Sequence, residues 1–216
     1  MQENVVQKPL LRGVMHQWAF FLSIPGAGFL IFNSPSPIIF WSMLVYALSL
    51  LGLLGISALF HRVNWSPRYR QKMGIADRTM IYLFIAGNFT PFAFIAMDGA
   101  LPIILLVLLW SAAVLGSIVN VFWYDAPNWI HAFLYTFVAC MCFFALPQIL
   151  SFIGMTGVIW ILLGGLVHLI GGMVYALRFP DPSPQKFGFH EVFHCFVTVG
   201  LLIHYGVVVN YLLLVH

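Results

Sequence analysis

The sequence predicts an all-α membrane protein, built as a single domain of seven transmembrane helices. Charged residues make up only 7% of the 216 residues, against about 25% in a typical soluble domain. Hydrophobic residues make up 62%, and the mean hydropathy is +0.99. The apolar residues also gather in runs of roughly 20, the length that a helix needs to cross a bilayer. Nine basic and six acidic side chains cannot coat a soluble particle, and the formal charge of +3 argues against nucleic-acid binding.

The seven apolar runs are separated by short segments that break helices. These segments are rich in Pro, Gly, Asp and Ser, the residues that favour turns. No segment between them is long enough for a soluble domain, so residues 1–216 are expected to form one transmembrane unit. The predicted helices span about 13–33, 38–61, 77–97, 101–123, 129–147, 157–177 and 188–214.

The basic residues predict the orientation of this bundle. With seven spans, all nine Lys and Arg fall on one side of the membrane, and the loops on the other side contain none. Because such residues remain on the cytoplasmic side, we expect a cytoplasmic N-terminus, an outside C-terminus and a multi-pass protein of the cell membrane, with the bacterial inner membrane as the expected location. The nine residues are Lys8, Arg12, Arg62, Arg68, Arg70, Lys72, Arg78, Arg178 and Lys186.

Four ionisable residues mark a candidate metal site at the cytoplasmic ends of three predicted helices. His61 closes the second helix, Asp77 opens the third, and His190 and His194 begin the seventh. The last two are four residues apart, which places both imidazoles on one helix face, and Ser57 and His61 repeat that spacing. Three neutral histidines with an open fourth position are typical of catalytic zinc, and Asp77 could bind the metal's water, accept its proton or orient a ligand. Two alternatives remain open: interfacial histidines bonded to backbone carbonyls, or another metal such as Fe(II), Co(II) or Ni(II).

Residues His190–His194 also fit the metalloprotease pattern H-E-x-x-H, in which Glu191 would be the general base. Glu191 is the last acidic residue of the chain, so no carboxylate ligand follows it. Gly200 stands where a longer version of the motif requires a third histidine, and Asp98 is expected at the opposite membrane face. An intramembrane metalloprotease is therefore the minor alternative.

The other histidines favour structural roles. For His16 and His131, near the starts of the first and fifth predicted helices, we expect interfacial anchoring, with a place lining the metal site as the alternative for His16. For His168 and His204, deeper in the sixth and seventh, we expect hydrogen bonds within the bundle, with a polar path outward as the alternative for His204. Four glycines predict close packing of the sixth helix against a neighbour. They are Gly164, Gly165, Gly171 and Gly172.

Taken together, these motifs resemble the hemolysin III-type proteins of the progestin and adiponectin receptor family, and the resemblance covers nearly the whole chain. Ser-Ala-Leu-Phe-His at residues 57–61 resembles the family's Ser-x-x-x-His. The run 76–92 resembles its Asp-led third helix, and 187–197 resembles its H-x-x-x-H seventh helix. The segment 8–16, ending in a histidine, resembles its N-terminal region.

The resemblance implies a seven-helix bundle with a zinc ion near the cytoplasmic side. His61, His190 and His194 match the family's three ligands, Asp77 matches the carboxylate beside the zinc's water ligand, and Ser57 matches the serine beside the site. Related receptors and alkaline ceramidases imply hydrolysis of a lipid amide, with a membrane lipid or fatty acid as ligand. Small bacterial members are linked to membrane homeostasis.

Two classes of function follow from these expectations. In the first, the protein is a zinc-dependent hydrolase of a ceramide-like lipid amide, with Asp77 and Ser57 as catalytic residues. In the second, it is a non-enzymatic, receptor-like or homeostasis-regulating protein in which zinc is structural. A cytolysin or pore former belongs to the second class, but the sequence shows scattered polar residues rather than the polar stripe that a pore requires.

Overall fold

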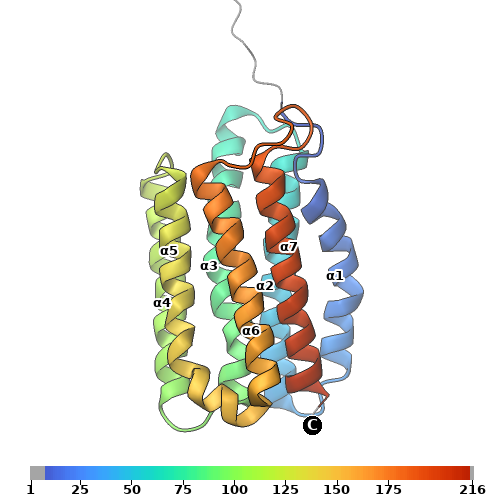
Figure 1. Cartoon of the computed structure of the whole chain (residues 1–216), viewed down its shortest axis with the longest axis vertical. Helices are drawn as coiled ribbons and strands as arrows, with labels where there is room; N and C mark the ends of the chain where they lie inside the picture. Colours follow the sequence, from blue (N-terminus) through green and yellow to red (C-terminus); the bar gives the residue numbers. More distant parts are fainter. Residues whose placement is uncertain (1–7, 215–216) are drawn as a thin grey trace, which may run out of the picture.

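The chain folds into a bundle of helices that run along the long axis of the molecule (Figure 1). A computed structural model describes residues 8–214. Within that range there is no β-strand, only an isolated bridge between Ser183 and Phe187. The seven α-helices are α1 (Val14–Phe32), α2 (Pro37–Arg62), α3 (Pro67–Ile95), α4 (Leu101–Phe122), α5 (Asn128–Cys140), α6 (Leu146–Leu177) and α7 (Phe189–Val207).

Two short elements modify this pattern. A 3₁₀ turn, η1 (Met141–Ala145), joins α5 to α6, and α7 continues as a π-helix, η2 (Val208–Leu213). Four helices begin with a proline in their first two positions, where its missing N–H costs nothing. These prolines are Pro37, Pro67, Pro102 and Pro147.

The bundle is that of a membrane protein. Five helical segments are long and apolar enough to cross a bilayer. One of them includes both α5 and α6, although the chain runs down the bundle as α5 and back up as α6 (Figure 1). Helix α3 is outside this group; it carries Arg78, Asn88 and Thr90 among its apolar residues. The five segments are Val14–Phe32, Pro37–Arg62, Leu101–Phe122, Asn128–Leu177 and Phe189–Leu213.

Three predicted boundaries were wrong. Helix α3 begins at Pro67, so Asp77 lies ten residues inside it and the preceding loop is short. Helix α5 ends at Cys140 and α6 begins at Leu146, with a non-helical Gly154 (φ 72°) where the prediction expected a loop. Hydropathy detects only the part of a helix that lies in lipid, whereas backbone hydrogen bonding continues the helix into polar sequence on either side.

Helices α6 and α7 interlock through two reciprocal pairs of glycine and histidine. A methyl group on Gly164 of α6 would collide with the imidazole of His204 on α7, and one on Gly200 of α7 would collide with the imidazole of His168 on α6. His168 Nδ1 lies 2.8 Å from the carbonyl oxygen of Gly164, and His204 Nε2 lies 3.3 Å from that of Ile161. The two histidines therefore bond within the bundle, as the sequence indicated.

Of the four α6 glycines predicted to pack closely, only half contact a neighbouring helix closely. Gly164 and Gly171 face α7, whereas Gly165 and Gly172 have no atom within 4 Å of the position that a methyl group would take. The prediction of close packing was thus right for two positions and wrong for the other two, because residues one apart on a helix point in directions 100° apart.

The interlock can be tested by adding one methyl group at a time. Gly164→Ala and Gly200→Ala should each destabilise the protein by about 1–3 kcal/mol, because overpacking displaces a partly buried imidazole. Gly165→Ala and Gly172→Ala are matched controls and should be neutral or stabilising by up to about 1 kcal/mol, the helix-propensity gain of alanine over glycine. Thermal unfolding in detergent measures all four; equal losses in both pairs would contradict the interlock.

Candidate metal centre

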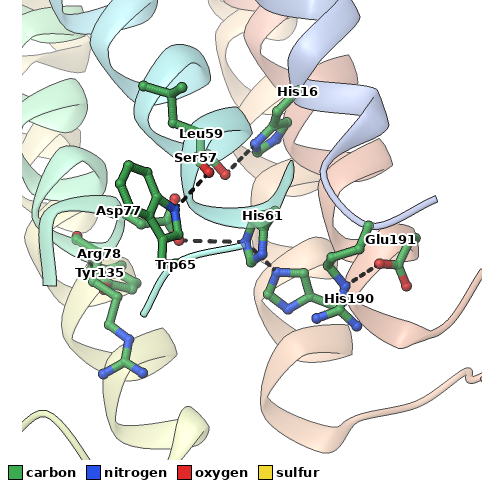
Figure 2. Close-up of polar contacts among 11 residues, drawn as sticks. His16, Ser57, Leu59, His61, Trp65, Asp77, Arg78, Tyr135, His190 and Glu191 are labelled. Atoms are coloured by element: carbon green, nitrogen blue, oxygen red, sulfur yellow. Dashed lines mark hydrogen bonds and ion pairs between the residues drawn. The ribbon is translucent and has the colours of Figure 1, made fainter. Parts of the chain in front are cut away.

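Three histidines, His61, His190 and His194, converge at one end of the bundle, and Figure 2 shows the first two of them. His61 lies in the last turn of α2, and His190 and His194 lie in the first two turns of α7. Each offers a ring nitrogen, and the three nitrogens lie within 4.8 Å of one another. His61 and His194 are only 5% and 2% exposed, and His190 is partly buried.

The spacing of these nitrogens fits a bound metal ion. His61 Nε2 lies 3.1 Å from His190 Nε2, whereas two nitrogens bound tetrahedrally to one zinc lie roughly 3.4 Å apart, given Zn–N bonds of about 2.0–2.1 Å. A single shared proton can join only two of the three nitrogens, so a cation is the group that would satisfy all three at once. The chemistry of the donor set, all neutral imidazoles, suits zinc and its neighbours in the periodic table.

Asp77 lies on the metal side of this cluster. Its Oδ2 is 3.7 Å from His61 Nε2, the same nitrogen that faces His190. The carboxylate is therefore not beside Nδ1, on the far side of the ring from the other histidines, where it would only orient the ring. From its position it can act on an ion or on a small molecule held by the three histidines.

Ser57 links Asp77 to the rest of the site. It lies one turn before His61 on α2, is 2% exposed, and hydrogen-bonds the Asp77 side chain. The structure thus brings together all five residues that the sequence proposed for the site, from α2, α3 and α7.

His16 is a sixth member, and the prediction for it was wrong. It is 3% exposed, which excludes the role of an interfacial anchor. His16 Nδ1 lies 2.8 Å from Ser57 Oγ, and its ring stacks on His194 with a centroid distance of 3.9 Å and an interplanar angle of 3°. The signal that could have revealed it is its depth, since His16 begins the first helix on the same side of the membrane as the other three histidines.

The segment before α1 covers this centre. Leu10 and Leu11 donate backbone hydrogen bonds of 3.1 Å to Gln185 and Lys186, in the loop that precedes α7. Gly13 then has a φ of 78°, and a methyl group there would lie 2.5 Å from His61 Cβ. Both the left-handed backbone and the close approach to His61 require glycine at this position.

Glu191 contacts this covering segment rather than the position where a metal ion would bind. It is 1% exposed, its Oε1 forms an ion pair with Arg12, and its Oε2 accepts a 2.8 Å hydrogen bond from the Gly188 backbone N–H. Figure 2 shows Glu191 beside the candidate ligands. With both oxygens engaged, the geometry offers no free base from H-E-x-x-H. Glu191 instead ties the start of α7 to the N-terminal segment.

His131 also departs from the role that the sequence favoured. It is 1% exposed, and its Nε2 lies 3.4 Å from Arg78 Nη1. Arg78 in turn donates to the carbonyl oxygen of Tyr124 and receives a 3.3 Å hydrogen bond from Tyr135 on its own carbonyl oxygen. His131 thus belongs to a second polar cluster, between α3 and α5, and not to the membrane interface.

Comparison with known proteins agrees with this architecture. The profile of a family described as "Haemolysin-III related" matches residues 4–205. A "Hemolysin-3 homolog" of Bacillus subtilis (strain 168) is 26% identical over 199 residues, which are 90% of each chain. "Hemolysin-3" of Bacillus cereus is 26% identical over 214 residues, 96% of this chain and 93% of that protein.

A shorter similarity extends to eukaryotes. The "ADIPOR-like receptor IZH2" of Saccharomyces cerevisiae (strain ATCC 204508 / S288c) is 39% identical over 62 residues, 26% of this chain and 20% of that protein. The family resemblance read from the motifs is thereby confirmed. With a family match over almost its full length and an all-helical, membrane-type bundle, the chain belongs to the haemolysin III-related family of membrane proteins.

Proposed function

We propose that this protein is a zinc-dependent membrane hydrolase whose substrate is a ceramide-like lipid amide. One observation carries the proposal: three imidazole nitrogens lie within 4.8 Å of one another, and a carboxylate oxygen lies 3.7 Å from one of them, on the metal side. Three histidines with an adjacent carboxylate form the donor set of hydrolytic zinc sites. His61, His190 and His194 would hold the ion.

Each remaining side chain has a definable task. The ion, when bound, would lower the pKa of a coordinated water to about 7 and polarise a substrate carbonyl. Asp77 would take up the proton that the water loses and later return it to the leaving amine. Ser57 has one hydroxyl proton, so it can hydrogen-bond either Asp77 or the developing oxyanion of the substrate, and a switch between the two would accompany the reaction.

The location of the site supports a lipid substrate. The candidate ligands lie at the ends of apolar helices, and the outer surfaces of α1 and α2 expose large hydrophobic side chains such as Phe21, Leu22 and Leu48. An acyl chain can therefore lie among or along the helices while its polar head approaches the histidines. Membrane lipids are the proposed partners, with a lipid amide or a fatty acid as the ligand at the metal.

A second candidate is a non-enzymatic, receptor-like or homeostasis-regulating protein in which the zinc is structural. The observation that favours it is that the three histidines come from α2 and α7, which share little direct packing elsewhere. An ion held between them would join two helices that the fold alone leaves weakly connected. Metal binding of this kind contributes directly to folding free energy.

We propose seven membrane spans with the N-terminus in the cytoplasm. Support comes from the Lys and Arg residues, which all lie in or beside the segments at the metal end of the bundle. A reporter that works only outside the cytoplasm, fused after His216, should be active, and a reporter that works only in the cytoplasm should be inactive there. The reverse pattern would contradict both the span count and the cytoplasmic position of the metal centre.

The metal ligands predict a simple stoichiometry. Elemental analysis of the purified protein should find about one zinc per chain, and His61→Ala, His190→Ala and His194→Ala should each lower it well below one, because two imidazoles hold zinc poorly. His168→Ala is the control, since it removes a partly buried histidine outside the cluster and should leave the zinc content unchanged. A full zinc content in the His194→Ala variant would exclude this set of ligands. Iron, cobalt or nickel in the wild-type protein would show that the bound metal is not zinc.

Asp77 separates catalysis from scaffolding. Asp77→Asn keeps the shape of the side chain but cannot accept a proton, so hydrolysis of a ceramide-like amide should fall by about 10²–10⁴. Zinc affinity should fall by no more than about 10–100-fold. Glu191→Gln is the control, because Glu191 is bonded to Arg12 and Gly188, and hydrolysis should remain within a few-fold of the wild type.

Two outcomes would redirect the proposal. Loss of turnover in Glu191→Gln with a silent Asp77→Asn would favour metalloprotease chemistry. A zinc-loaded wild type that hydrolyses no lipid amide, but loses thermal stability sharply on chelation, would favour the structural role of zinc.

A further inference from the structure

His16 lies within the metal centre without belonging to its ligand set. It comes from α1, whereas the three candidate ligands come from α2 and α7. Its imidazole is parallel to that of His194 at 3.9 Å, so the two rings stack face to face rather than pointing their nitrogens at one point. Its nitrogens are not among those that lie within 4.8 Å of one another. The role of His16 therefore depends on its other contact, the 2.8 Å approach of Nδ1 to Ser57 Oγ.

The direction of that hydrogen bond follows from the number of protons available. Ser57 also neighbours the Asp77 carboxylate and can donate its proton to it, whereas a carboxylate can only accept. The single hydroxyl proton of Ser57 is therefore directed to Asp77. Ser57 Oγ must then accept from His16, so the neutral imidazole of His16 carries its proton on Nδ1.

The other nitrogen of His16 takes no part in this network. His16 Nε2 is buried and has no hydrogen-bond partner among the residues that the structure describes. An unpaired buried acceptor is costly, so its presence shows that the ring is held in place by its Nδ1 bond, by its stack on His194 and by the anchored segment before it. Arg12 and Gly13, just ahead of His16, are themselves fixed against Glu191 and His61.

We propose that His16 is a positioning residue of the metal centre: through Nδ1 it orients the Ser57 hydroxyl, and through Ser57 it holds the Asp77 carboxylate beside the metal position. The inference rests on the metal site of the proposed function but not on the hydrolase reaction. The chain of contacts runs from α1 to α2 to α3, so three helices cooperate to fix one carboxylate. Without His16, Ser57 would keep its proton free to rotate, and Asp77 would lose its fixed partner.

Cobalt(II) is the probe for this role, because its visible absorption reports the geometry of its ligands. Three variants of the full-length protein separate the contributions of the Nδ1 donor, the Nε2 position and the flat ring of His16. His16→Asn retains a donor near the Nδ1 position but loses the ring; His16→Gln places its amide near the Nε2 position; His16→Phe keeps a flat ring that can stack on His194 but donates no hydrogen bond. Unfolding of the metal-free proteins checks that each variant is folded.

If His16 acts through Nδ1, the asparagine variant keeps the cobalt affinity of the wild type and the other two variants lose it. We expect His16→Asn to bind cobalt within about threefold of the wild-type affinity, with the same visible bands. His16→Gln and His16→Phe should bind about 10–100-fold more weakly, the usual effect of losing an outer partner of a metal site, with shifted bands. A residue that served only to fill space would give the opposite order, since phenylalanine fills the volume and asparagine leaves a cavity; that order would overturn the proposal.

A double-mutant cycle tests whether the effect passes through Ser57. In a Ser57→Ala background, His16→Gln should cause no further loss of cobalt affinity, because the bond that it breaks is already gone. A loss of the same size in both backgrounds would overturn the proposal. A wild-type protein that takes up neither cobalt nor zinc would overturn the metal site and this role together, whereas normal uptake that is insensitive to all three His16 variants would overturn this role alone.

Discussion

A polar group inside a bilayer must find its partner within the protein, and this constraint organises the whole molecule. Backbone groups satisfy it by forming helices. Several polar side chains meet it in clusters: His16, Ser57 and Asp77 with the three candidate metal ligands; Arg78 with His131 and Tyr135; and His168 with His204 deeper in the bundle. Because each cluster joins different helices, together they determine which helices can be neighbours.

The metal centre shows how much of this organisation depends on segments far apart in the sequence. The pair Arg12–Glu191 and the backbone bonds of Leu10 and Leu11 bring the N-terminal segment onto the loop and helix start that carry His190 and His194. Gly13 lets that segment approach His61 closely. The same contacts that close the bundle at this end therefore also surround the candidate ligands.

The geometry also distinguishes the two carboxylates that the sequence considered, Asp77 for the metal site and Glu191 for the minor alternative. Glu191 sits between two candidate ligands in the chain, but both of its oxygens are engaged by Arg12 and by the Gly188 backbone. Asp77 is more than a hundred residues away from His190 in sequence, yet its oxygen lies beside His61 Nε2. Glu191 is the closer of the two in sequence, yet it faces away from this cluster because neighbouring side chains on a helix point in different directions.

By itself, the sequence determined the all-helical membrane fold, the approximate positions of the helices and five of the residues that meet at the candidate metal centre. These features depend on hydropathy, helical periodicity and local spacing, all of which are properties of short stretches of chain. Only the tertiary structure decided that α3 begins at Pro67, that His16 is buried against Ser57 and His194, and that Glu191 belongs to the N-terminal contact. Each of these depends on which helices pack together and on how far each is rotated about its axis, and no pattern within a single helix specifies that rotation.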